Sequence, residues 1–136
     1  MTTNVEILRK LYADANDNNM DAVLAVMAPD VEWIYPDGLA DYGIGNAKGR
    51  EEVRALLNLA QRLFSSEYRN PEDFVESGDR VVAFGTYHLR GARSGVDGVV
   101  RFAHYFHMAD GQVKNLAVYY DSAELRRVLE PTTSGG

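Results

Sequence analysis

Apolar residues in the first half of the chain recur at the spacing of amphipathic helices. The first such segment begins at a capping box, in which Thr3 and Glu6 satisfy free amide groups at a helix start. Its apolar face consists of Val5, Leu8, Leu11, Tyr12 and Ala15. A second, short helix is expected to stop before Pro29, and residues 50–64 carry the most regular helical stripe of the chain. The pattern therefore predicts three N-terminal helices.

After residue 67 the apolar period changes from helical to alternating. Four segments are predicted as strands: residues 69–76, 80–90, 99–108 and 112–120. Ser77-Gly78-Asp79 and Asp110-Gly111 have the composition of hairpin turns, so the strands that flank them are expected to pair antiparallel. An earlier strand is predicted at residues 31–35. A last short helix is expected to follow the strands.

Local hairpins of this kind favour the α+β class over a parallel sheet built from βαβ units. We expect one domain, residues 1–130, in which three helices pack on the concave face of the sheet. Residues 131–136 have nothing to bury and are predicted to be a disordered tail.

Composition and charge narrow the function classes. The chain has 136 residues, 46% of them hydrophobic and 25% charged, which is typical of a globular domain. Its net charge is −6, and the scattered Lys and Arg residues argue against a nucleic-acid partner. No apolar run approaches the roughly 20 residues of a membrane span, and no secretory signal is visible, so a cytoplasmic location is expected. Because the chain has no cysteine, thiolate metal sites and cysteine nucleophiles are excluded.

Several short motifs resemble, in order and spacing, the SnoaL-like branch of the nuclear-transport-factor-2-like (NTF2-like) superfamily. They are residues 11–12 (LY), 16–21 (NDNNMD), 29–33 (PDVEW), 49–53 (GREEV), 102–106 (FAHYF) and 119–125 (YYDSAEL). The branch is similar to ketosteroid isomerases, polyketide cyclases and limonene-epoxide hydrolases. The resemblance implies an α+β cone with a curved, mixed, mostly antiparallel sheet. It also implies a cofactor-free apolar pocket, proton transfer next to a carbonyl, and a homodimer packed through the sheet.

Asp121 is the first candidate for chemistry. It matches the aspartate proposed as the acid/base of polyketide-cyclase relatives, and burial in an apolar pocket would raise the pKa of such a carboxyl group. The alternative is structural, because Asp121 and Glu124 also form a helix N-cap pattern before Leu125. The sequence leaves both roles open.

His104 is the second candidate. It alternates with Phe102 and Phe106 on an apolar strand face, so its side chain is expected to point inward. By resemblance it would donate a hydrogen bond to a substrate carbonyl or act as the base; the alternative is a core histidine bonded to a polar neighbour. A two-residue turn at Asp110-Gly111 would place Phe102 opposite Tyr119. Asp121 would then share the His104 face at a distance of about 13 Å, which a substrate could bridge.

The pocket wall is expected to consist mainly of aromatic residues. The predicted substrate-binding residues are Tyr12, Trp33, Tyr35, Phe102, Phe106, Tyr120 and, near the pocket mouth, His88. The three histidines have no carboxylate at metal-ligand spacing, so no metal and no cofactor are expected.

The sequence also departs from the named enzymes. Tyr35 occupies the position before Pro36 where ketosteroid isomerases carry their catalytic aspartate, which argues against steroid isomerisation. Arg101 and Asp121 supply only part of the epoxide-hydrolase set. Two hypotheses follow. The chain is an isomerase-, cyclase- or lyase-like enzyme acting on a small apolar carbonyl compound, or it is a non-catalytic module that binds an apolar ligand or a protein.

Overall fold

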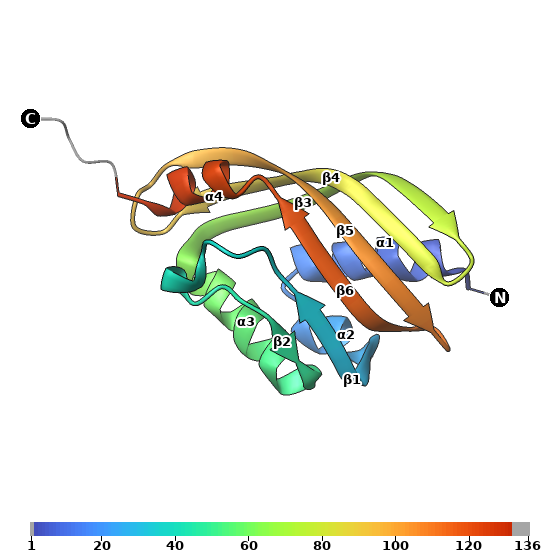
Figure 1. Ribbon diagram of the computed structural model, residues 1–136. Helices are drawn as coiled ribbons and strands as arrows, with labels where there is room; N and C mark the ends of the chain where they lie inside the picture. The colour runs from blue at the N-terminus through green and yellow to red at the C-terminus, as the bar shows by residue number, and fades with distance from the viewer. Residues whose placement is uncertain (1, 132–136) are drawn as a thin grey trace, which may run out of the picture.

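The computed structural model describes residues 2–131, which form four α-helices and a curved six-stranded sheet (Figure 1). The elements are α1 (Asn4–Asn16), α2 (Met20–Ala25), β1 (Met27–Ile34), the 3-10 helix η1 (Ala40–Tyr42), β2 (Ala47–Lys48), α3 (Gly49–Leu63), β3 (Phe64–Ser77), β4 (Arg80–Gly91), β5 (Asp97–Ala109), β6 (Gln112–Tyr120) and α4 (Ser122–Leu129). The predicted α+β class is confirmed. Apart from Pro131, the predicted disordered tail lies outside the described residues.

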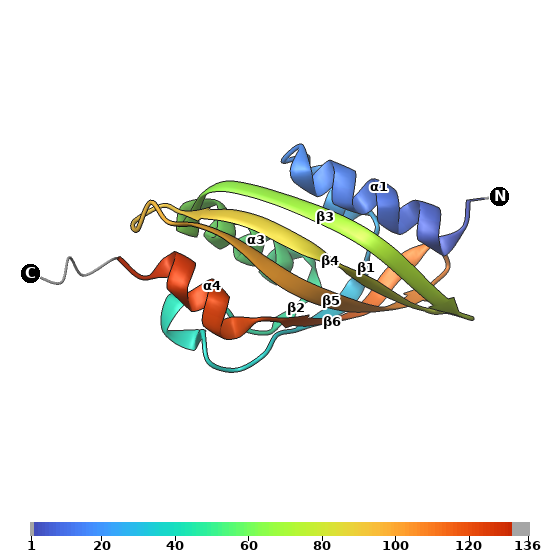
Figure 2. The same ribbon diagram turned by 90° about the horizontal axis from the view of Figure 1, so that it is seen from above.

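The strands are ordered β2-β1-β6-β5-β4-β3, and only the β1–β6 pair among them is parallel. Figure 2 shows α1 alongside β3 on one face of the sheet, with α4 at the opposite end of the molecule from the N-terminus. α1 begins at the predicted capping box, since the Thr3 hydroxyl accepts a 3.1 Å hydrogen bond from the Glu6 amide. The face of α1 turned to the sheet is buried at Leu8, Leu11 and Tyr12.

The pairing of β3 with β4 is irregular next to Pro71. The β3–β4 register shifts between Pro71 and Asp73, and Gly85 lies opposite Pro71. A Cβ atom at Gly85 would lie only 2.2 Å from the carbonyl oxygen of Asn70 and 2.9 Å from the Phe102 ring. Glycine therefore lets the two strands and the Phe102 ring pack closely at this irregularity.

The β5–β6 hairpin differs from the predicted register. Asp110 (φ 52°) and Gly111 (φ 76°) form the expected two-residue turn, with Ala109 paired to Gln112. Further along, however, Met108 pairs with Val113 and His107 with Asn115, so Lys114 is an extra residue in β6. Such a bulge reverses which side chains of the strand face inward.

The pairing register of the rest of β6 therefore differs by one residue from the predicted register. Phe102 lies opposite Tyr120, not Tyr119, and His104 lies opposite Val118. The bulge lies beside an irregular stretch of β1, which contains Pro29 and loses its regular pairing with β6 between Met27 and Glu32. Proline cannot donate to a ladder, so the pairing is interrupted at this point.

Candidate functional site

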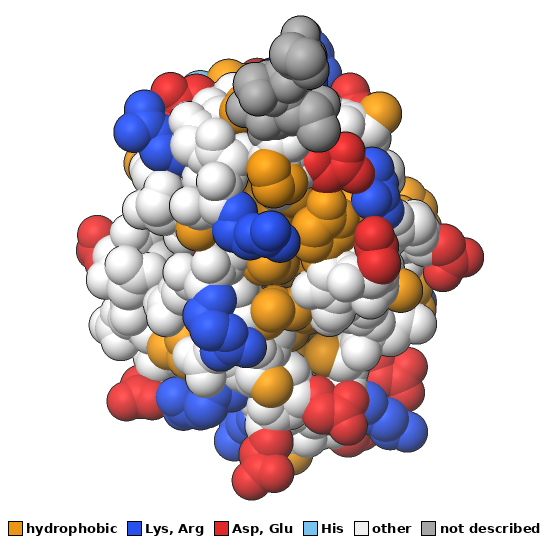
Figure 3. All heavy atoms as spheres, turned by 90° about the vertical axis from the view of Figure 1, so that its left-hand side faces the viewer, with side chains coloured by type: hydrophobic (Ala, Val, Ile, Leu, Met, Phe, Trp, Pro, Cys, Tyr) orange, Lys and Arg blue, Asp and Glu red, His pale blue; other side chains and the backbone are white. Residues whose placement is uncertain are grey.

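A largely apolar cavity of about 120 Å³ lies between the concave face of the sheet and the helices α1, α3 and α4. Figure 3 shows the end of the molecule where α4 lies, with a group of hydrophobic side chains bordered by charged ones. The polar or charged side chains in the cavity wall are those of Tyr12, Trp33, Tyr35, Arg69, Tyr87, His104 and Tyr120. They form three groups, which come from different strands.

The first group is the pair of Tyr12 and His104. The Tyr12 hydroxyl lies 2.6 Å from Nδ1 of His104, and the two rings are nearly parallel with centroids 5.8 Å apart. Phe102 stacks on the imidazole at 4.1 Å, and Phe106 meets it edge-on at 6.2 Å. The predicted alternative of a histidine bonded to a polar neighbour is thus realised in a residue that also lines the cavity.

Burial, and secondly the nearby Arg69 cation, lowers the pKa of His104 from 6.5 to about 3, so the imidazole is neutral at pH 7. Burial also raises the pKa of the Tyr12 hydroxyl, which therefore keeps its proton. A protonated hydroxyl donates to Nδ1, and from this we infer that the imidazole carries its own proton on Nε2. No residue among 2–131 accepts a hydrogen bond from that Nε2–H group.

The second group is an ion pair at the β3–β4 side of the cavity, which the sequence analysis missed. Arg69 donates to Glu67 at 2.9 Å and to the Tyr87 hydroxyl at 3.1 Å, and Tyr87 donates to the same Glu67 oxygen. The Arg69 and Glu67 side chains are only 16% and 12% exposed. Asn16 of α1 holds the Arg69 backbone through two 2.8 Å hydrogen bonds.

Burial opposes the charge on Arg69, but Tyr87 and Glu67 outweigh it and the pKa of the guanidinium stays above its ordinary value. Burial likewise raises the pKa of Tyr87. Strand alternation was the available sequence signal. Glu67 and Arg69 are two residues apart, so they face the same side of β3, and they lie opposite Leu89 and Tyr87 of β4. Charged residues in a hairpin near the sheet edge are, however, usually solvated, and the predicted strand began only at residue 69.

The third group consists of three rings: Trp33 on β1, Tyr35 in the segment after β1, and Tyr120 on β6. Their ring centroids lie 6.4 Å (Trp33 to Tyr35) and 6.3 Å (Tyr35 to Tyr120) apart. Burial raises the pKa of Tyr120 to about 12, and burial followed by the neighbouring Tyr120 raises that of Tyr35. Within residues 2–131, the Trp33 Nε1 and Tyr120 hydroxyl groups are buried without a hydrogen-bond partner.

Asp121 does not lie in the cavity, and the predicted shared face with His104 is wrong. The side chain is exposed and accepts a 3.1 Å hydrogen bond from the Glu124 amide, so Asp121 is the N-cap of α4. The Lys114 bulge explains the error, because each side chain after it faces the opposite side of the sheet from the one predicted. The sequence left two roles open for Asp121, and in the structure this residue is a helix cap.

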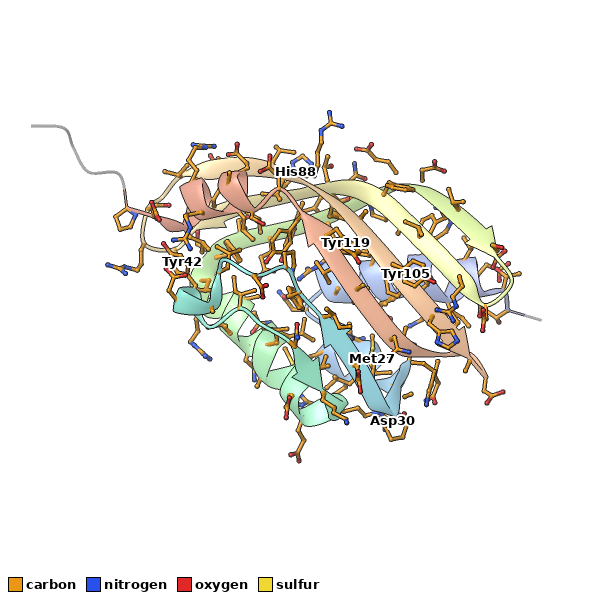
Figure 4. All side chains as sticks on the ribbon, in the orientation of Figure 1. Met27, Asp30, Tyr42, His88, Tyr105 and Tyr119 are labelled. Atoms are coloured by element: carbon orange, nitrogen blue, oxygen red, sulfur yellow. The ribbon has the colours of Figure 1, made fainter. Side chains whose placement is uncertain are left out.

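His88 is also outside the cavity. It is exposed on the outer face of the sheet, with its Nε2 atom 3.2 Å from the Thr86 hydroxyl, and Figure 4 shows it at the outer edge of the molecule. The remaining predicted residues line the cavity wall: Tyr12, Trp33, Tyr35, Phe102, His104, Phe106 and Tyr120.

Comparison with known proteins identifies the family and the fold. A family model described as "SnoaL-like domain" matches residues 8–116. The chain belongs to the SnoaL-like family. None of the curated proteins compared with the chain matches it.

Solved structures share the SnoaL-like fold over nearly the whole chain. An NTF2-like protein of unknown function from Burkholderia pseudomallei K96243 is 30% identical, with a TM-score of 0.89, and the match covers 95% of this chain and 98% of that one. TerC, co-crystallized with polyporic acid, is also 30% identical, with a TM-score of 0.87 and coverage of 93% and 97%. A protein from Catenulispora acidiphila DSM 44928 with a ketosteroid isomerase-like fold, in complex with trimethylamine, shows the fold alone at 14% identity, a TM-score of 0.80 and coverage of 93% and 94%.

The SnoaL-like domain thus offers neutral hydrogen-bond groups and one ion pair around an apolar space. Within residues 2–131 there is no group of three His, Asp or Glu side chains that could hold a metal ion. No helix in this part of the chain combines the length and apolar composition needed to cross a membrane. The arrangement can bind an apolar molecule, orient an oxygen on it and exchange a proton with it.

Proposed function

We propose that the chain is a cofactor-independent enzyme that moves a proton on a small, flat, mainly apolar carbonyl compound, as isomerases, cyclases and lyases do. The observation that carries this proposal is the neutral His104 imidazole, held by Tyr12 in the cavity wall, whose Nε2–H group has no acceptor among residues 2–131. A preorganised neutral donor stabilises the negative charge that forms on a carbonyl oxygen when a neighbouring C–H bond breaks.

The size of the cavity limits the substrate. An apolar cavity of roughly 150 Å³ engineered in another protein binds benzene. A cavity of about 120 Å³ therefore suits a compound of about one ring, and a steroid would require the wall side chains to move. The co-crystallization of TerC with polyporic acid supports an organic ligand for this chain as well.

The proton acceptor in this proposal is Glu67, reached through Tyr87. As the substrate C–H bond breaks, its electron pair moves toward the carbonyl oxygen at His104. The proton passes to the Tyr87 oxygen while the proton of Tyr87 passes to Glu67 along their existing hydrogen bond. Arg69 keeps both groups in place and supplies a positive charge close to the developing enolate. The return of a proton from Glu67 through Tyr87 exchanges the hydrogen when it goes to the original carbon, and isomerises the compound when it goes to another carbon of the enolate.

Exchange of hydrogen for deuterium next to a carbonyl tests the proposal directly. Acetophenone is incubated with the protein in D₂O, and the methyl signal is followed by proton NMR. We expect the wild type to accelerate its loss, and His104→Ala or Tyr87→Phe to lower the rate by about 10²-fold or more. His88→Asn and Tyr68→Phe, which change exposed side chains outside the cavity, should leave the rate unchanged. Failure of the wild type to exchange any member of a set of small aryl ketones would refute the enzymatic proposal.

A non-catalytic binding module is the second candidate. It is favoured by the state of the nearest carboxylates, since Glu67 is tied to Arg69 and Tyr87 and Asp121 caps α4. A module of this kind would bind the same ketones, as measured by calorimetry, without exchanging their protons. The two outcomes separate the candidates in one set of samples.

The outer face of the sheet supports the homodimer implied by the family resemblance, and we propose it as the dimer interface. Phe84, Tyr105 and Tyr119 lie on neighbouring strands and are 45%, 37% and 59% exposed. Figure 4 shows Tyr105 and Tyr119 on the broad face of β5 and β6. Apolar area of this kind is usually covered by a partner. Light scattering should give twice the monomer mass, and Tyr119→Glu should reduce it to that of a monomer; a monomeric wild type would exclude the dimer.

A further inference from the structure

The cavity wall contains one cation and no anion. Within residues 2–131, no Asp or Glu side chain lines the cavity, and His104 is neutral because its pKa is about 3. Arg69 does line the cavity. Burial opposes its charge, but Tyr87 and Glu67 keep the pKa of the guanidinium above its ordinary value. Arginine is rarely buried without a partner, so the position of the partner decides how much of the charge the cavity receives.

The carboxylate that pairs with Arg69 lies outside the cavity. Arg69 and Glu67 both line a second, smaller pocket, formed by β3 with α1, α2 and α3, but only Arg69 also lines the main cavity. Burial and then the Arg69 cation set the pKa of both Tyr12 and His104, and Glu67 contributes to neither shift. The ion pair therefore presents its positive end to these walls of the cavity.

Arg69 has N–H groups left for a bound molecule. Both of its side-chain hydrogen bonds, to Glu67 and to Tyr87, start from the same nitrogen, Nη2. A guanidinium group has five N–H donors, and among residues 2–131 nothing accepts from the Nε and Nη1 groups of Arg69. Hydrogen bonds from a cation to an oxygen anion are roughly twice as strong as neutral ones. A negatively charged oxygen would thus complete this arginine better than a neutral one.

The neutral polar groups of the wall also prefer acceptors. The His104 Nε2–H group, the Trp33 indole N–H group and the Tyr120 hydroxyl have no acceptor within residues 2–131. An indole only donates, and burial raises the pKa of Tyr120 to about 12, so its hydroxyl keeps its proton. These donors need not reach a single atom, because each favours an electron-rich ligand in its own part of the cavity.

We propose that the cavity binds weakly acidic ring compounds as their oxygen anions, with the negative oxygen paired to Arg69. When the neutral compound binds, its O–H bond breaks, the electron pair stays on the oxygen and the proton goes to the buffer. Phenols and enols belong to this ligand class. The inference rests on the proposed function in one respect, that the ligand occupies this cavity.

The single-ring acid 4-nitrophenol tests the inference, because its anion is yellow and its neutral form is nearly colourless. An opposite charge within roughly 4–6 Å lowers the pKa of an acid by about 1–3 units. We expect the wild type to bind the anion at least about tenfold more tightly than the neutral form. The bound compound should then turn yellow at a pH about one unit or more below that of the free compound.

The titration reports on the ligand, because the groups that face Arg69 keep their protonation near neutral pH. Burial raises the pKa of the hydroxyls of Tyr12, Tyr35 and Tyr87, so all three stay protonated. His104, with its pKa of about 3, stays neutral. Replacement of Glu67, the carboxylate paired with Arg69, belongs to the variant described next.

A double variant removes the charge without leaving its partner unpaired. Arg69→Met combined with Glu67→Gln should abolish most of the preference for the anion. Arg90→Met combined with Asp97→Asn removes an exposed ion pair of the same 2.9 Å length outside the cavity, and should retain the preference. Tyr87→Phe keeps Arg69 and should retain it as well, which separates the charge from the hydroxyl.

The outcomes separate this inference from the proposed function. A wild type that binds the neutral form as tightly as the anion, or binds neither form, would overturn the inference whether or not the double variant folds. A preference that persists in a folded double variant would overturn it too. Exchange of acetophenone protons in those cases would leave the proposed function standing. A preference that the double variant loses, without exchange of any ketone, would support the inference and refute the enzyme.

Discussion

Lowering the pH from 7 to 4 should destabilise the wild-type chain more than a variant in which His104 is replaced by asparagine. In the folded chain the pKa of His104 is about 3, whereas an unfolded chain has the ordinary value of 6.5. Below pH 6.5 the unfolded state therefore binds a proton that the folded state does not accept. Stability from this residue is fully present above pH 6.5 and is lost as the pH falls toward 3.

The size of the effect follows from the width of this pH window. A pKa difference contributes about 1.4 kcal/mol per pH unit within the window. Part of the His104 surface remains accessible, and because the ring lines the cavity, that surface faces the cavity. Between pH 6.5 and 4 we expect the free energy of unfolding of the wild type to fall by about 2–3 kcal/mol more than that of His104→Asn.

Urea unfolding at several pH values measures the difference, and subtraction of the variant removes the carboxylates that titrate in both proteins. Tyr12→Phe is the control, since burial is the main cause of the shift and the variant keeps the ring buried. It should retain most of the pH dependence. A wild type and a His104→Asn variant that lose stability in parallel would refute the reasoning. So would an NMR titration in which the His104 ring gains its proton near pH 6.5.

Substitutions at Asp121 and in the Arg69–Glu67 pair test the other charged groups. Asp121→Ala should lower the free energy of unfolding by about 1 kcal/mol, because the α4 helix loses its cap. Asp121→Asn should preserve both stability and ketone exchange. A loss of exchange in a stable Asp121→Asn protein would show that this carboxyl group takes part in the chemistry. Arg69→Met should destabilise the fold by about 3–5 kcal/mol, because it leaves Glu67 buried without its partner. Adding Glu67→Gln to this variant should restore most of the lost stability. Denaturation curves that show no recovery would mean that Arg69 stabilises the fold through packing rather than charge.

The elements that were predictable from the sequence are those set by local interactions. The α1 cap at Thr3, the apolar face of α1 and the Asp110-Gly111 turn depend on residues within a few positions of one another, and each is confirmed. The inward direction of His104 followed from strand alternation and is also correct.

The parts that were not predictable depend on contacts between distant segments. The bulge at Lys114 lies beside a break in β1 near Pro29, and the sequence of the β5–β6 hairpin does not predict it. The Lys114 ammonium group pairs with Asp30 at 2.9 Å across the same irregular stretch. Glu67 and Arg69 are likewise visible only once β3 is known to face the cavity, because charged residues in strands are normally solvated.

One extra residue in β6 therefore decides the chemistry of the cavity. With regular pairing, the side chains of Tyr119 and Asp121 would face inward, and a carboxylate would share the space with His104. With the bulge, Tyr120 faces inward and Asp121 caps a helix, so the wall contains neutral donors and Arg69, whose carboxylate partner Glu67 lies behind the wall. A site of this composition stabilises a developing negative charge on the substrate more readily than it removes a proton by a free base. Its substrates should consequently be carbonyl compounds whose C–H bond is more acidic than that of a simple aliphatic ketone, as in the aryl ketones of the exchange assay.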